Sequence, residues 1–255
     1  DKNYKSGRTP VRLNRSVRSL TDDEEMRNKV WQQVRLQEYL AEMPIIQLGF
    51  EGTEADDVIA YICQMRYYRG CQKIIISNDK DFMQLCDDYT VLYRPTSDQL
   101  LNVPRIVESV GVHPTNMALA RAIAGDKSDN LKGVGGIGLK TIKKRLPFLA
   151  EAKTYTIDDV VRHCEEIDSG LKIYSSIMEG KDIVEHNYKM MQLYSPAISV
   201  QSKAVVDHQV ENFECYFSKT QILKMMVEDG FSELNWEPLK AALNRISVTC
   251  FEKEA

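Results

Sequence analysis

A glycine-rich segment between residues 123 and 145 limits the folds open to this chain more than any other feature. Its sequence is Ile123-Ala-Gly-Asp-Lys-Ser-Asp-Asn-Leu-Lys-Gly-Val-Gly-Gly-Ile-Gly-Leu-Lys-Thr-Ile-Lys-Lys-Arg145. Residues 133–138 match G-x-G-x-x-G, the dinucleotide-binding pattern, which has structural meaning only when a buried strand leads into it. Polar turn formers precede it here. We therefore interpret the segment as a glycine hairpin between two helices, Met117 to Ala124 and Leu139 to Leu146.

The same segment suggests two chemical roles. Asp126 and Asp129 open it and can hold a divalent metal. The glycines let backbone N–H groups approach a phosphate, and a following helix N-terminus favours negative charge. A turn that merely connects two helices is the structural alternative. The cations that follow, Lys140, Lys143 and Lys144, favour nucleic acid.

The rest of the chain predicts a sheet followed by helices. Thr21 to Glu24 resembles a capping box, and one helix should continue to about Glu42. Buried strands are predicted at Ile45–Phe50 and Lys73–Ser77, and a third at Thr90–Tyr93, with a helix from Glu54 to about Tyr68 between the first two. Later helices are expected from Asn102 to Val110, from Pro114, two or three times within 155–195, at Gln221–Val227 and at Pro238–Arg245, with a possible strand near Ala197–Val206.

Strand–helix–strand order with apolar strands indicates an α/β fold. We expect a central, mostly parallel sheet flanked by helices, with a helical subregion that contains the glycine hairpin. No internal repeat or long linker is visible, so one domain over residues 1–255 is predicted.

Charge and cysteine content narrow the class of protein. The net charge of −4 is not that of a general nucleic-acid binder, but residues 1–20 hold six basic side chains against one acid, and acids concentrate at 51–57 and 79–88. Separate basic and acidic patches suit a protein that binds phosphate in one place and metal in another. Six scattered cysteines without zinc-ligand spacing indicate reduced thiols in an intracellular protein, cytoplasmic in a bacterial or phage-infected cell.

Three acidic groups fall where an α/β sheet places its site. Glu54, Asp56 and Asp57 follow the first predicted strand, and Asp79 and Asp81 follow the second. Ligands bind outside the carboxyl ends of such strands, so these groups should share one edge, with the acids of the glycine segment folded back over it. Oxygen ligands suit Mg²⁺ or Mn²⁺. Each acidic group alone has a structural explanation, as acids that stabilise a helix N-terminus or as turn and cap residues. The three groups together favour a functional site.

These motifs resemble those of the 5′-nuclease (flap endonuclease) superfamily. They are Glu54-Ala-Asp-Asp57, Ser77-Asn-Asp-Lys-Asp81, Gly125-Asp-Lys-Ser-Asp-Asn130 with the hairpin, and Tyr4-Lys5-Ser-Gly-Arg8, which resembles the family's Tyr-Lys-x-x-Arg segment. The similarity is closest to phage 5′–3′ exonucleases and to the 5′-nuclease domain of bacterial DNA polymerase I. It extends from Tyr4 to about Arg145.

The resemblance implies a two-metal phosphodiesterase with Mg²⁺ or Mn²⁺. By that likeness Glu54 and Asp56 belong to the first metal, Asp79, Asp81 and Asp126 to the second, and Asp57 and Asp129 act as accessory ligands. Lys5 and Arg8, beside Tyr4, would contact the reacting phosphate from a helical gateway in residues 1–35. The hairpin would be a helix-hairpin-helix element, often with a monovalent cation such as K⁺, that grips duplex DNA without reading its bases. Its contact residues would be Lys132, Gly133, Gly135, Gly138, Lys140, Lys143 and Lys144.

Within this scheme, residues 44–100 form the sheet core with the acidic cluster, residues 102–150 the hairpin subregion and residues 151–255 a helical C-terminal part. The family has a first strand bearing an Asp, and a second Asp upstream of the Tyr-Lys-x-x-Arg segment. Neither is in this sequence, and we expect both in a preceding segment. Without them the first metal loses ligands, and this piece alone would be inactive.

The leading hypothesis is a metal-dependent, structure-specific 5′ nuclease that acts on DNA with a 5′ flap or free 5′ end, or on RNA primers in RNA/DNA hybrids. We expect a monomer without membrane contact, with a replication partner as a further possibility for residues 150–255. A catalytically inactive module that binds DNA junctions is the alternative from a different class. A PIN-like ribonuclease would share the acidic cluster but gives no reason for the hairpin.

Overall fold

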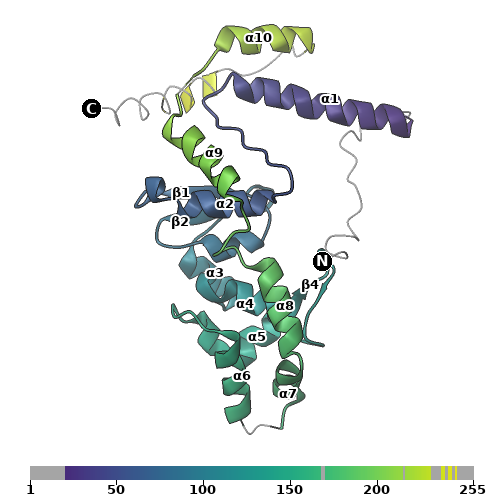
Figure 1. Cartoon of the computed structure of the whole chain (residues 1–255), viewed down its shortest axis with the longest axis vertical. Helices are drawn as coiled ribbons and strands as arrows, with labels where there is room; N and C mark the ends of the chain where they lie inside the picture. Colours follow the sequence, from purple (N-terminus) through teal and green to yellow (C-terminus); the bar gives the residue numbers. More distant parts are fainter. Residues whose placement is uncertain are drawn as a thin grey trace. The chain divides into compact units, whose positions relative to one another are not determined.

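Two units make up the described part of the chain (Figure 1). The computed structural model describes residues 21–167, 170–214 and 216–230, together with residues 237, 238, 241, 242 and 245. One unit contains residues 52–199, and the other contains residues 21–51 with residues from 200 onward. The expected single domain and its four subdivisions remain a prediction.

The first unit contains a small mixed sheet. Strand β1 (Lys73–Ile76) pairs in parallel with β2 (Thr90–Arg94), which pairs antiparallel with β3 (Gln99–Leu101). The α/β class is therefore confirmed, but the expectation of a mostly parallel sheet is wrong. The reason is local: a 3₁₀ turn, η3 (Pro95–Ser97), and Asp98 at φ 48° reverse the chain directly, so no crossover helix separates β2 from β3.

Two predicted strands are absent. Residues 45–50 have no regular structure, because β1 pairs only with β2 among the described strands, and an apolar run without a pairing partner cannot form a ladder. Ile45 is 44% exposed, so this run is not buried either. Ala197–Val206 overlaps helix α9 (Val200–Glu211), where Val206 and Val210 are buried at helical spacing. β-Branched residues such as valine favour strands. Here the buried valines are four residues apart, a spacing that places them on one face of a helix and favours the helix.

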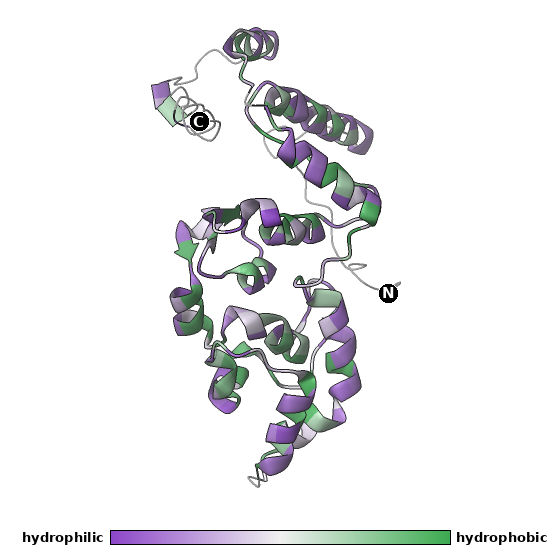
Figure 2. Cartoon of the chain, turned by 60° about the vertical axis from the view of Figure 1, so that its left-hand side comes forward, coloured by the Kyte–Doolittle hydropathy of each residue, from purple (hydrophilic) through white to green (hydrophobic). Residues whose placement is uncertain are grey.

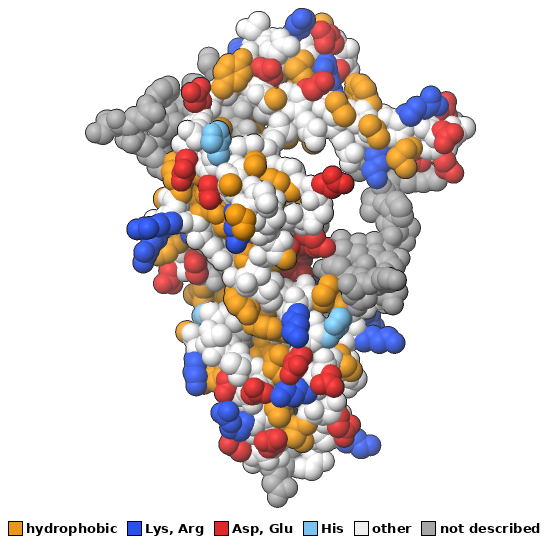
Figure 3. All heavy atoms as spheres, in the orientation of Figure 1, with side chains coloured by type: hydrophobic (Ala, Val, Ile, Leu, Met, Phe, Trp, Pro, Cys, Tyr) orange, Lys and Arg blue, Asp and Glu red, His pale blue; other side chains and the backbone are white. Residues whose placement is uncertain are grey.

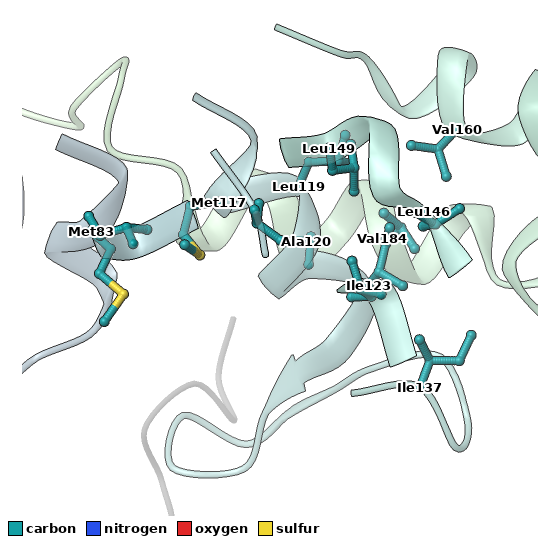
Figure 4. Close-up of a cluster of buried hydrophobic side chains, with 14 of the residues drawn as sticks. Met83, Met117, Leu119, Ala120, Ile123, Ile137, Leu146, Leu149, Val160 and Val184 are labelled. Carbon is teal, nitrogen blue, oxygen red and sulfur yellow. The ribbon is translucent and has the colours of Figure 1, made fainter. Parts of the chain in front are cut away.

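Helix α4 (Pro114–Ala124) forms the centre of the first unit and packs most extensively against α8 (Lys181–Met191). Met117, Leu119, Ala120 and Ile123 are all buried, as expected for a helix covered on every side. Figure 4 shows the core running from Met83 and Met117 to Ile137 and Val160. The surrounding helices carry hydrophobic and hydrophilic sides (Figure 2), and they are α2 (Ala55–Gln64), α3 (Val103–Val110), α5 (Leu139–Arg145), α6 (Ile157–Glu166) and α7 (Lys172–Glu179).

Short elements complete this unit. The 3₁₀ segments are η1 (Arg66–Tyr68), η2 (Asp81–Leu85) and η4 (Pro147–Ala150). Two short strands, β4 (Gly125–Asp126) and β5 (Leu131–Lys132), pair antiparallel with each other. The predicted strands near 73 and 90, the helices from Asn102 and Pro114, and the hairpin between two helices are all present. Three helices lie within 155–195.

The second unit contains α1 (Asp22–Ala41), α9 and α10 (Lys219–Glu228). The predicted capping box is confirmed, because Thr21 accepts from the Glu24 N–H while the Glu24 carboxylate accepts from the Thr21 N–H at 2.9 Å. The helix predicted at Pro238–Arg245 lies largely outside the described residues.

Among the described helices, none combines the length and the apolar content that crossing a bilayer requires. Acidic and basic side chains alternate over the end that carries α6 and α7, on the face shown in Figure 3. That part of this face therefore has no patch of a single charge.

Candidate metal centre

Three aspartates from separate segments meet in the first unit. Asp81 begins η2 just after β1, Asp126 ends β4 directly after α4, and Asp129 lies in the turn between β4 and β5. Each offers a carboxylate oxygen, and these oxygens all lie within 4.8 Å of one another. Asp129 is only 4% exposed, so its carboxylate faces inward. Such a group of hard oxygen donors suits Mg²⁺ or Mn²⁺.

The turn after α4 sets the position of Asp126. Gly125 has φ 74°, a conformation that glycine adopts without strain, and it redirects the chain into β4. The Ser128 N–H then donates to the Asp126 carboxylate at 2.7 Å, and the Ser128 hydroxyl donates to the same oxygen. Opposite, Gly133 packs so closely on Ala124 and Gly125 that an added Cβ would overlap their backbone. The glycine-rich sequence thus fixes the loop that carries two of the three aspartates.

Arg121 bridges two members of the cluster from α4. Its Nε lies 2.6 Å from Asp81 Oδ1, and its Nη2 contacts Asp126. The Nε–Oδ1 pair lacks the alignment of a hydrogen bond, so this contact is chiefly an attraction between charges. The three side chains are between 11% and 17% exposed. A guanidinium in this place offsets part of the repulsion among the carboxylates.

The environment shifts two carboxyl groups in opposite directions. The pKa of Asp81 is raised to about 7, chiefly by burial and also by the like charges of Asp79, Asp126 and Asp129, while Arg121 acts to lower it. Burial also acts to raise the pKa of Asp126, but the hydrogen bonds from Ser128 and the charge of Arg121 outweigh it, so that pKa is lowered. A divalent cation favours the charged form of every carboxylate it touches. The raised pKa of Asp81 therefore reflects chiefly its burial, and a bound cation would act to lower that pKa.

The first acidic group lines a cavity of about 300 Å³ that also includes Asp81. Glu54 is the N-cap residue of α2, and Asp56 and Asp57 lie in its first turn. Asp57 accepts a hydrogen bond from the Ala197 N–H at 2.8 Å. Asp81 thus belongs to both sets of acids, although no strand delivers the first set to this edge.

Asp79 has a different position from the other acids. Its side chain is exposed, and its Oδ1 accepts from the Asp81 N–H at 2.9 Å, as in an Asx turn. It is not among the three mutually close aspartates. Tyr4, Lys5 and Arg8 lie outside the described residues, as does most of the expected gateway before α1.

The hairpin residues divide into packed and open positions. Gly133 is enclosed by backbone, whereas Gly135 and Gly138 have no atom within contact distance of an added Cβ. Lys132, Lys140 and Lys144 are exposed. Lys143 is exposed as well, and its Nζ reaches α3, where it donates to the Glu108 carbonyl at 2.7 Å.

Sequence reasoning missed Arg121, Ser128 and Lys189, the last of which lines the acidic cavity. Arg121 left a readable signal, since it is a single cation inside the apolar run from Met117 to Ala124. Ser128 stands two residues after Asp126, the spacing at which a Ser can hold an Asp side chain in a turn. Lys189 left none, because its position depends on how α8 packs on α4.

Comparison with known proteins finds nucleases among the relatives of this chain. Residues 1–111 match the sequence profile of the family described as "5'-3' exonuclease, N-terminal resolvase-like domain". The chain is 30% identical over 156 residues to the 5′–3′ exonuclease of Aquifex aeolicus (strain VF5). These matches show that the chain is similar to 5′–3′ exonucleases and flap endonucleases. The predicted resemblance is thereby confirmed.

Further relatives among flap endonucleases and DNA polymerases have comparable identity. The chain is 31% identical over 159 residues to the flap endonuclease Xni of Shewanella sediminis (strain HAW-EB3), and 38% over 104 residues to DNA polymerase I of Rhizobium leguminosarum. These matches cover 62% and 41% of this chain. The chain spans 50% of the Aquifex exonuclease, 59% of the Shewanella enzyme and 10% of the polymerase.

Solved structures share the fold. A T5 D15 protein co-crystallised with metal ions superposes with a TM-score of 0.60 at 19% identity, over 88% of this chain and 77% of that one. The T5 5′-exonuclease with bound divalent zinc gives 0.58 at 20% identity, over 81% of this chain and 73% of that one. At these identities the likeness establishes the fold alone.

Proposed function

We propose that the protein is a divalent-metal-dependent 5′ nuclease that cuts phosphodiesters at 5′ ends or flaps of DNA. The observation that carries the proposal is the convergence of Asp81, Asp126 and Asp129 within 4.8 Å. The similarity to known proteins supports it, because the relatives include flap endonucleases and 5′–3′ exonucleases.

The residues fit a two-metal reaction. Asp81, Asp126 and Asp129 would hold one Mg²⁺ or Mn²⁺, with Asp79 beside them, and Glu54, Asp56 and Asp57 would contribute to a second. When bound, such cations stabilise the charge that develops on the phosphodiester and activate the attacking water. Lys5 and Arg8 would contact the reacting phosphate, with Tyr4 nearby. A solved T5 flap endonuclease carries both DNA and metal ions, which supports DNA as the substrate.

The hairpin would bind the duplex away from the cut. Gly135 and Gly138 have open space beside their Cα atoms, so a phosphate could approach the backbone there, and Lys132, Lys140 and Lys144 are exposed. Gly133 would support the loop, and Lys143 would reach the backbone only after leaving Glu108. Such contacts position DNA without reading sequence. K⁺ at the hairpin and RNA/DNA hybrids as substrates belong to the same proposal.

The test uses the full-length protein with a 5′-flap DNA substrate and Mg²⁺. Wild type should cleave near the junction, whereas Asp126→Asn should lose cleavage by roughly 10²-fold or more while retaining DNA binding in Ca²⁺. The alternative, an inactive junction-binding module, predicts equal binding by both proteins and cleavage by neither. Cleavage by Asp126→Asn at the wild-type rate would remove that aspartate from the reaction.

A further inference from the structure

A cavity of about 490 Å³ lies beside the aspartate cluster and has no role in the function proposed above. Residues of β2, β3, α3 and α4 line it. Its floor is apolar and includes Met83, Leu101 and Met117, whereas its rim carries four cations and a single acid. These rim residues are Lys80, Arg94, Arg105, Arg121 and Glu108. We call this cavity the β3–α3 pocket.

Three of the four cations retain capacity to bind an anion. Arg121 is engaged by Asp81 and Asp126. The Arg105 Nη1 donates to the Leu100 carbonyl at 2.6 Å, and no acceptor among the described residues takes up the rest of its guanidinium. The Nε of Arg94 is buried, and no acceptor from the described residues reaches it. Lys80 is exposed and makes no ion pair within the described part of the chain.

This balance favours a negatively charged ligand. A buried guanidinium donor without an acceptor is costly, so a ligand oxygen placed there gains more than it would at an exposed arginine. Among the residues that line the pocket, Glu108 is the single acid, and the Lys143 ammonium bonded to its carbonyl adds another positive charge nearby. Arginine forks match the oxygens of a phosphate, and the apolar floor suits a sugar or base.

The pocket adjoins the aspartate cluster. Arg121 lines the pocket and also holds two of the clustered aspartates, and Lys80 directly precedes Asp81 in the chain. We propose that the β3–α3 pocket binds one phosphate-bearing nucleotide of the substrate strand, with its phosphate against Arg94 and Arg105. This inference rests on the proposed nuclease function, because that function places a nucleic-acid strand at the cluster. The pocket would fix the position of the substrate strand relative to the aspartate cluster, whatever the base sequence.

Replacing one phosphate of the DNA at a time by an uncharged methylphosphonate identifies the phosphate that the pocket binds. A series of 5′-flap DNAs, each with one methylphosphonate near the junction, is measured for binding to the full-length protein in Ca²⁺. With wild type, one position of the series should raise the Kd roughly tenfold, as loss of a charged hydrogen bond does. Arg94→Gln and Arg105→Gln should each raise the Kd for unmodified DNA by a similar factor, and the same methylphosphonate should then cost them nothing further.

The controls separate this pocket from general charge and from catalysis. Arg66→Gln removes an exposed cation on η1 and should leave both Kd and the methylphosphonate profile unchanged. Lys80→Gln changes an exposed side chain and serves if Arg94→Gln does not fold. With Mg²⁺, the pocket variants should raise KM about tenfold with kcat within about twofold.

Two results would overturn the proposal. Pocket variants that bind unmodified DNA like wild type would exclude the contact. So would variants that still lose affinity at the same methylphosphonate position, because another group would then bind that phosphate. If the protein cleaves no substrate, the nuclease proposal fails, yet the binding series in Ca²⁺ still decides whether the pocket holds a phosphate.

Discussion

Arg121 Nε lies 2.6 Å from Asp81 Oδ1 inside a cluster of acids that would otherwise repel one another. Breaking a buried pair of this kind leaves uncompensated charge and costs about 3–5 kcal/mol. Arg121→Gln should therefore lower the free energy of unfolding in EDTA by about that amount. In Mg²⁺ the loss should be smaller, since ligand binding to the native state restores stability.

Urea unfolding with and without Mg²⁺ checks this prediction at fixed pH. The matched control is Arg162→Gln, which removes an arginine whose Nη1 lies 3.3 Å from Asp159 and whose side chain is 65% exposed. That change should stay within about 0.5 kcal/mol. An equal loss for Arg121→Gln in EDTA and in Mg²⁺ would show that the guanidinium and the cation do not compensate the same charges.

The raised pKa of Asp81 predicts how stability varies with pH. Burial, together with the neighbouring acids, takes this pKa from 3.8 to about 7 in the folded protein, so between these values the folded state binds more protons than the unfolded state. Stability should therefore fall as the pH rises from about 4 to 7, by on the order of 4 kcal/mol. Asp81→Asn cannot ionise and should remove this slope. Denaturant midpoints at a series of pH values in EDTA measure it, and a slope unchanged by Asp81→Asn would assign it to another group.

Two glycines of the hairpin should respond differently to alanine. An added Cβ at Gly133 would overlap the backbone of Ala124, while Gly135 has open space around it. Gly133→Ala should cost roughly 1–3 kcal/mol or more, and it should displace the loop that carries Asp126. Gly135→Ala should stay within about 1 kcal/mol. Thermal unfolding compares them, and similar losses for both variants would contradict the close packing at Gly133.

The sequence revealed the acids more reliably than the elements that present them. Asp81 was recognised because it follows a predicted strand, and Asp126 and Asp129 because they open the glycine-rich segment. Such signals are local, and hydrogen bonds such as Ser128 to Asp126 also act within a few residues. The strand expected at Ile45–Phe50 failed because strand formation depends on a distant pairing partner. Likewise, β3 was missed because a strand of three residues is too short to show an alternation of polar and apolar side chains. Arg121 could be seen as unusual in an apolar helix, but its two partners depend on how α4 meets η2.

A carboxylate joins two helices in the second unit. Asp229, just after α10, accepts from Arg35 Nε at 2.7 Å and from the Tyr39 hydroxyl at 2.7 Å, and both donors lie on α1. The Arg35 hydrogen bond lowers the pKa of Asp229 below 3.8, so its stabilisation is present above that value and is lost as the pH falls further. Asp229→Ala should raise amide exchange in α10 and in the last turns of α1. Exchange unchanged at neutral pH would mean that other contacts hold the two helices together.

Asn187 of α8 ties the aspartate loop to the core of the first unit. It is 2% exposed, and its Nδ2 donates to the Ala122 and Lys132 carbonyls, each at 2.9 Å. Asn187→Ala leaves both acceptors unsatisfied, which should cost about 2–4 kcal/mol. Because Ala122 lies before β4 and Lys132 ends β5, the variant should also loosen the loop between them. Mg²⁺ should then stabilise it less than wild type.

Asn116 is the matched control for Asn187, because it is a buried asparagine whose hydrogen bonds lie outside the aspartate loop. It is fully buried and donates through Nδ2 to the carbonyls of Leu149 and Lys153, at 3.1 and 2.9 Å, away from the aspartates. Asn116→Ala should therefore destabilise the protein to a similar degree while retaining the wild-type gain in stability on adding Mg²⁺. Calorimetric unfolding of both variants across a Mg²⁺ titration measures the difference. If both lose the same part of the gain, Asn187 acts through overall stability, and its bonds to Ala122 and Lys132 do not position the metal ligands.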